Sequence, residues 1–132
     1  DFFEETTLLG IVAPLKDYQF CWQLNQALHY DFRINNEIEI QLIKKERKYF
    51  FAVYQYPLPN TSLSHYIYNN QFDGEPLLPE FKNLDFLWLM KGDTVSTGDL
   101  ADLMTNILGI SGVQLVTLLK SEQIKHKKHL IF

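Results

Sequence analysis

The chain is poor in cysteine and has no glycine-rich segment, and these two shortages exclude whole classes of site. Cys21 is the only cysteine among 132 residues, so neither an intrachain disulfide nor a multi-cysteine zinc site can form. The six glycines are scattered along the chain, and none belongs to a phosphate-binding loop. We expect Cys21 to be a buried core thiol, and a chain without disulfides fits a reducing cytoplasm.

Long apolar runs and excess positive charge are also missing. No stretch approaches the roughly 20 apolar residues of a membrane span, and no secretory leader is visible in a chain that begins at Asp1 rather than at Met. The formal net charge of −4 argues against nucleic-acid binding. We expect the basic runs at 44–48 and 125–128 to be solvated, as a turn and a tail.

Aromatic and aliphatic residues are abundant instead. Ten Phe, seven Tyr and two Trp contribute to an apolar fraction of 46%, so the chain has enough material for a core without staples. There is no low-complexity linker or composition break. We therefore expect residues 1–132 to form a single domain.

Hydrophobic periodicity predicts six strands and two helices. The predicted helices are 15–29 and a second one from Ser96 or Thr97 to 108, and Gly109 is placed to end the second in a left-handed conformation. Residues 49–56 are apolar on both faces, which indicates a central strand. The other predicted strands are 6–13, 37–42, 63–68, 84–90 and 113–119.

Two helices with one apolar stripe each must cover a sheet, so the fold class is α+β. We expect an antiparallel or mixed sheet of about six strands with both helices on one face. The element order β-α-β-β-β-β-α-β resembles a ferredoxin-like split βαβ with extra strands.

One segment carries a family resemblance. Residues 78–86 read Leu-Pro-Glu-Phe-Lys-Asn-Leu-Asp-Phe. This stretch resembles the signature of the IPExxxVDY family, small uncharacterised proteins found mainly in Bacteroidetes. Pro79, Glu80 and Asp85 match by identity, and Asn25 lies in a region similar to that family's first helix. The resemblance implies no established activity.

The motif has two physical interpretations. In the first, Glu80 or Asp85 accepts backbone N–H groups or pairs with Arg33 or Lys82, which would fix a loop. In the second, the two carboxylates line a binding site. Pro79, Glu80, Asp85 and Asn25 are therefore the candidate binding residues.

Catalytic chemistry finds little support in the sequence. No nucleophile lies beside a base, and His29, His65, His126 and His129 do not cluster, so we expect no catalytic residue, no metal site and no cofactor. The high aromatic content instead suggests a sheet face that needs a cover. We expect a cytoplasmic, non-catalytic binding or protein-interaction module that forms a homodimer, or binds a protein partner, through this aromatic face. The alternative is a small-molecule sensor or enzyme with a pocket around Glu80 and Asp85, to which His65 or Asn25 could contribute.

Overall fold

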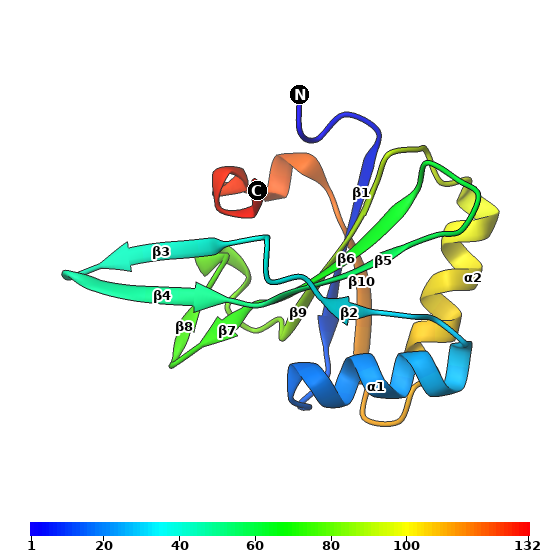
Figure 1. Ribbon diagram of the computed structural model, residues 1–132, viewed down its shortest axis with the longest axis horizontal. Helices are drawn as coiled ribbons and strands as arrows, with labels where there is room; N and C mark the ends of the chain where they lie inside the picture. The colour runs from blue at the N-terminus through cyan, green and yellow to red at the C-terminus, as the bar shows by residue number, and fades with distance from the viewer.

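The computed structural model describes residues 1–132 and has a six-stranded antiparallel sheet and two α-helices (Figure 1). The strand order is β10-β1-β9-β6-β5-β2, and β3–β4 and β7–β8 form two separate hairpins. In chain order the elements are β1 (Thr6–Val12), α1 (Asp17–Leu28), β2 (Arg33–Ile34), β3 (Ile40–Lys44), β4 (Arg47–Phe51), β5 (Val53–Pro57), β6 (Ser64–Asn69), β7 (Gln71–Phe72), β8 (Glu75–Pro76), the 3₁₀ turn η1 (Pro79–Phe81), β9 (Phe86–Lys91), α2 (Thr97–Leu108), β10 (Leu115–Leu119), and the 3₁₀ turns η2 (Ser121–Gln123) and η3 (Lys127–Leu130).

The predicted fold class and the antiparallel sheet are confirmed, but the predicted central strand 49–56 is wrong. The chain changes sheets at Ala52, so that β4 pairs with β3 in the hairpin while β5 pairs with β6 in the main sheet. Tyr49 and Phe51 are buried beneath the sheet and Val53 is buried within it, which explains the two-sided apolar pattern. The edge beyond β5 is β2, a two-residue strand that the sequence pattern does not reveal.

Both helices bury their apolar stripes against one face of the sheet. Phe20 of α1 stacks on Phe86 of β9, with 4.7 Å between ring centroids, and Ile107 of α2 belongs to the same core cluster. Ser96 caps α2 as expected, because its hydroxyl accepts the N–H of Asp99 at 3.1 Å. Cys21 is buried as expected.

The predicted left-handed helix end at Gly109 is wrong. Gly109 has a φ of −76°, because its N–H still donates to the carbonyl of Thr105 and continues the right-handed turn. The left-handed glycine is Gly112, with a φ of 92°, three residues further along.

The opposite face of the sheet, which we call the far face, is covered by the chain itself. The β3–β4 hairpin, residues 77–84 and the C-terminal turns all pack against it, and Figure 1 shows the hairpin and the C-terminal turns on the other side of the sheet from the helices. The expectation of an open aromatic face is therefore wrong. The buried residues of this second cluster are Leu8, Ile40, Tyr49, Phe51, Val53, Tyr66, Tyr68, Leu77, Leu78, Leu84, Leu87, Leu89, Leu119 and Leu130.

Lys125 and Lys128 are exposed as expected, but apolar residues that follow them are part of this cover rather than a solvated tail. Leu130 is 0% exposed, and its carbonyl accepts the hydroxyl of Tyr68 at 2.7 Å. The ring of Phe132 lies 4.9 Å from that of Tyr66. No helix of the structure combines the length and the apolar character needed to cross a bilayer.

Candidate functional site

Glu80 of the sequence motif lies in η1 and binds the C-terminal segment. Its Oε2 accepts the backbone N–H groups of Lys125 at 2.6 Å and His126 at 2.8 Å, and its Oε1 lies 2.9 Å from Nδ1 of His126. Burial alone would raise the pKa of Glu80, but these hydrogen bonds outweigh it and hold the pKa below its ordinary value. The carboxylate is therefore fully engaged by the chain's own backbone and imidazole.

Asp85 lies immediately before β9 and binds the end of β1. Its Oδ2 accepts the N–H of Ala13 at 2.8 Å, and its own N–H donates to the carbonyl of Ile11 at 2.8 Å. Partial burial raises the pKa of Asp85, and the Ala13 hydrogen bond opposes that rise. The geometry matches the first interpretation of the motif, in which a carboxylate accepts a backbone N–H group. Asp85 forms no ion pair with Arg33 or Lys82, and Arg33 pairs with Asp31 instead.

Asn25 and Pro79 complete the set of candidates. The side chain of Asn25 accepts the N–H of Phe32 at 2.8 Å and donates to its carbonyl at 3.0 Å, which fixes the chain after α1. Pro79 is the first residue of η1, where a missing N–H costs nothing. Pro79 and Glu80 are adjacent in η1, whereas Asn25 lies on α1 and Asp85 precedes β9. None of the four lines any of the five main cavities.

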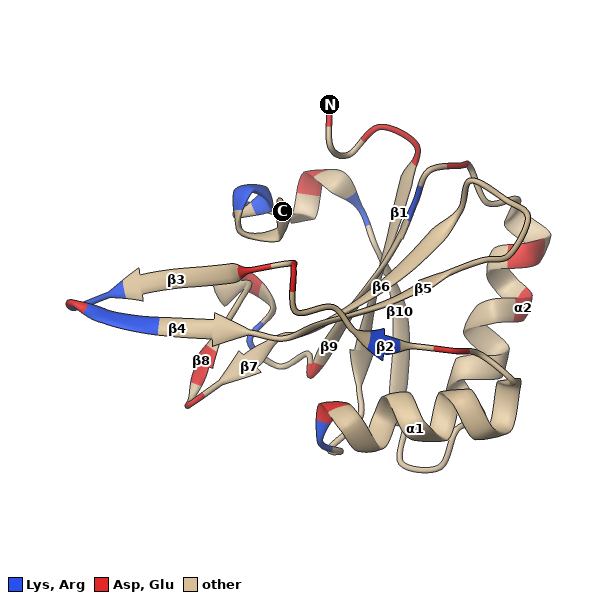
Figure 2. Ribbon diagram, in the orientation of Figure 1, with Lys and Arg blue, Asp and Glu red and all other residues tan.

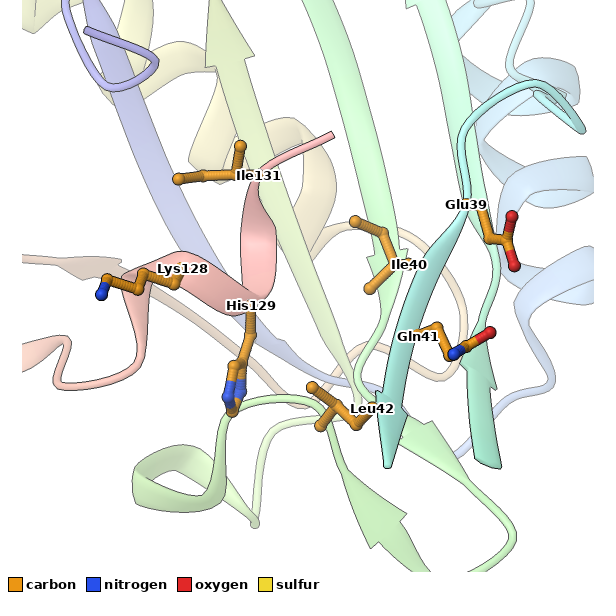
Figure 3. Close-up of a pocket in the computed structure, with 7 residues that line it drawn as sticks. All are labelled: Glu39, Ile40, Gln41, Leu42, Lys128, His129 and Ile131. Carbon is orange, nitrogen blue, oxygen red and sulfur yellow. The ribbon is translucent and has the colours of Figure 1, made fainter. Parts of the chain in front are cut away.

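A cavity of about 430 Å³ lies between β3 and the C-terminal turn η3 (Figure 3). In Figure 3 the charged groups of Lys128 and Glu39 point away from each other, so no pair of charges converges on the space. Nδ1 of His129 lies 2.7 Å from the carbonyl of Leu77, which makes this nitrogen the protonated donor. The cavity thus separates two parts of the far-face cover and presents little specific chemistry.

His65 on β6 occupies a more distinctive environment. The residue is 8% exposed, and its Nδ1 accepts the indole N–H of Trp88 at 3.0 Å. Burial lowers the pKa of His65 to about 4, so the ring is neutral at physiological pH. The rings of Tyr56 and Tyr30 stack on it, at centroid distances of 5.9 and 6.4 Å. From the sequence, His65 is expected only as a contributor to a pocket around Glu80 and Asp85. The signal that could single it out is a histidine within an otherwise apolar strand.

Two exposed surfaces also stand out. Strand β10 forms one edge of the main sheet, and Leu115 and Leu118 on it are 46% and 42% exposed. On α1, Tyr18 and Trp22 are exposed one helical turn apart. Helix α1 has no charged residue after Asp17, and the rest of its ribbon is tan in Figure 2.

Comparison with known proteins adds no assignment. No protein-family model matches the chain, and no curated protein matches its sequence. Kinship with the IPExxxVDY proteins therefore stays a prediction that rests on the motif at residues 78–86.

Proposed function

We propose that the chain is a non-catalytic interaction module of the cytoplasm that self-associates, and that two copies pair through their β10 strands. The observation that carries this proposal is the unguarded edge of the main sheet. Strand β10 reads Leu-Val-Thr-Leu-Leu and pairs only with β1, which leaves one row of its backbone groups free. Natural edge strands are normally guarded by Lys, Pro, bulges or short length. No charge and no proline interrupt residues 115–119.

The strand is also complementary to itself. An antiparallel pair centred on Thr117 would place Val116 of one copy opposite Leu118 of the other, and Thr117 opposite its own counterpart. Such an arrangement has the two-fold symmetry of most homodimers. It would cover the exposed side chains of Leu115 and Leu118 and join the two sheets edge to edge.

The arrangement of the main sheet supports the finer fold assignment that we propose, a ferredoxin-like core with extra strands. Strand β1 lies between β9 and β10, and helix α2 links these two flanking strands. The order β10-β1-β9-β6 has the alternation of a split βαβ, with β5 and β2 as the additional strands. This topology leaves β10 at an edge.

The alternative of an enzyme or sensor around Glu80 and Asp85 has weaker support. Both carboxylates are taken up by backbone N–H groups of the chain itself. They hold different segments, the C-terminal segment and the end of β1. A binding function at other surfaces therefore agrees better with the geometry than catalysis at the motif does.

Sedimentation velocity over a wide concentration range tests the proposal. We expect a concentration-dependent dimer for the natural sequence and a monomer for Leu118→Lys, since a lysine on each strand places two positive charges close together at the shared edge. Leu118 is already exposed, so this substitution should leave the fold intact. Trp22→Gln on α1 is the matched control and should leave the dimer unchanged. A natural sequence that stays monomeric, or a dimer that responds to Trp22→Gln and not to Leu118→Lys, would overturn the proposal.

A further inference from the structure

The hydrogen bond between Trp88 and His65 determines where the histidine proton lies. An indole nitrogen can only donate, so Nδ1 of His65 is the acceptor and the ring proton is on Nε2. Nε2 has no hydrogen-bond partner in the protein, although the residue is only 8% exposed. Every completely buried side-chain nitrogen or oxygen has a hydrogen-bond partner, so Nε2 of His65 is not completely buried. His65 is one of the residues that line a cavity of about 370 Å³.

The cavity has an apolar body and an acidic rim. Its volume lies within the range of small-molecule sites, which begins at about 300 Å³. Asp93 and Asp99 are its only charged residues, and neither takes part in an ion pair. The full lining is Tyr30, Leu58, Thr61, Leu63, His65, Met90, Asp93, Thr94, Val95, Asp99 and Leu103.

No basic side chain offsets the two acids. Lys91 is the basic residue nearest in sequence to Asp93. Its ammonium group donates a hydrogen bond to the carbonyl of Phe2 and lies over the Phe2 ring. Figure 2 shows that α2 has acidic residues but no basic ones. The N-terminus of α2 contributes roughly half a positive charge, which is less than the two carboxylates contribute in the opposite sense. The net field at the cavity mouth therefore favours a cation.

We propose that this cavity is a binding site for a small organic cation, an amine or quaternary ammonium with an apolar or aromatic body and a hydrogen-bond acceptor. The Nε2–H of His65 donates to the acceptor at the inner end of the ligand. The ammonium group lies at the mouth, where Asp93 and Asp99 attract it.

Trp88 supplies a built-in reporter for the test. Its indole N–H contacts the ring that would bind the ligand, so its signal in a ¹⁵N–¹H correlation spectrum should move when the cavity fills. Trp22→Phe identifies the signal of the only other tryptophan. Tyramine is the cationic probe, and 3-(4-hydroxyphenyl)propionate is its anionic counterpart with a similar body. We expect tyramine to shift the Trp88 signal saturably, with a Kd on the order of 1 mM or tighter, and the anion to leave it in place.

Substitution of the acidic rim tests the proposed charge recognition. Asp93→Asn combined with Asp99→Asn should weaken tyramine binding by about fivefold to tenfold, as expected for two solvent-exposed charge pairs. Asp102→Asn removes a charge from the same helix outside the lining and should leave the Kd unchanged. The backbone signals of each variant show whether it is folded. Absence of a saturable shift, equal binding of the anion, or an unchanged Kd in the double variant would overturn the proposal.

Discussion

Glu80 binds His126 at two points, the backbone N–H through Oε2 and the ring Nδ1 through Oε1, at 2.8 and 2.9 Å. These residues are 46 positions apart, and their contact fastens the C-terminal segment to η1. The segment continues to Leu130, which is fully buried against the far face. One carboxylate of the motif thus helps to keep the aromatic face of the sheet closed.

Loss of this carboxylate should destabilise the protein. In Glu80→Ala the N–H groups of Lys125 and His126 lose their acceptor, so the free energy of unfolding should fall by about 1–3 kcal/mol. Urea denaturation at pH 7 measures the change. Glu122→Ala, at an exposed acidic residue of η2, is the control and should stay within about 0.5 kcal/mol of the natural sequence. Equal effects of the two substitutions would show that Glu80 does not fasten the segment.

The same carboxylate predicts acid sensitivity. The pKa of Glu80 in the folded protein is below its ordinary value of 4.5, so the folded state binds this proton less readily than the unfolded state does. Its contribution to stability is complete above the ordinary value and is lost as the pH falls through the folded pKa. The free energy of unfolding, measured by urea denaturation at several pH values between 6 and 3, should therefore fall less steeply for Glu80→Gln than for the natural sequence. An equal fall in both proteins would contradict this role.

Two neighbouring C-terminal residues should differ sharply in their importance. Leu130 is 0% exposed and Ile131 is 46% exposed. Leu130→Ala should cost about 2–5 kcal/mol, as for other core leucines, whereas Ile131→Ala should cost less than about 1 kcal/mol. Thermal and urea unfolding of both variants measure the contrast. Similar small costs would mean that the C-terminal turn is not part of the core in solution.

The two helices and the cap at Ser96 could be predicted because local patterns determine them. A helix needs only its own stripe of apolar residues, and a cap needs only a hydroxyl at the right position. The change of sheet at Ala52 could not be predicted, because the apolar residues before and after it form one continuous pattern typical of a single strand. The buried Leu130 was hidden among lysines, because composition does not show which apolar face a segment will cover.

The candidate site was harder to predict than the fold. Glu80 and Asp85 could be singled out as carboxylates in apolar surroundings, and the interpretation of backbone fixation matches their hydrogen bonds. The cavity beside His65 could not be foreseen. Its lining comes from residues as far apart in sequence as Tyr30 and Leu103, and no local spacing connects them.

Asp85 should respond to substitution differently from Glu80. Its raised pKa means that the folded state disfavours the charge, so its ionisation lowers stability as the pH rises through the folded pKa. Asp85→Asn removes the charge but retains an oxygen for the Ala13 N–H, and should be neutral or stabilising at pH 7. Asp85→Ala leaves that N–H without an acceptor and should cost about 1–3 kcal/mol. Urea denaturation of both variants at pH 7 separates the two effects, and an Asn variant as unstable as the Ala variant would show that the charge itself is needed.

His65 should contribute a distinct loss of stability on mild acidification. Its pKa is lowered by burial from 6.5 to about 4, because a proton on Nδ1 would remove the acceptor of Trp88 and place a charge in an apolar site. A depressed histidine pKa gives stability that is complete above the unfolded value and is lost as the pH falls towards the folded one. The free energy of unfolding should therefore drop by about 2 kcal/mol between pH 7.5 and pH 5 through this residue.

His65→Gln separates this contribution from that of the carboxylates, which titrate mainly at lower pH. A glutamine oxygen can still accept the Trp88 N–H, and the side chain has no charged form. The variant should therefore lose most of the decline between pH 7.5 and pH 5 that urea denaturation shows for the natural sequence. An NMR titration of the natural sequence checks the same point without a substitution, because the His65 ring should stay neutral at pH 5. A ring that titrates near pH 6.5 would show that His65 is solvated, and the proposed hydrogen bond from its Nε2–H to a ligand would then lose its physical basis.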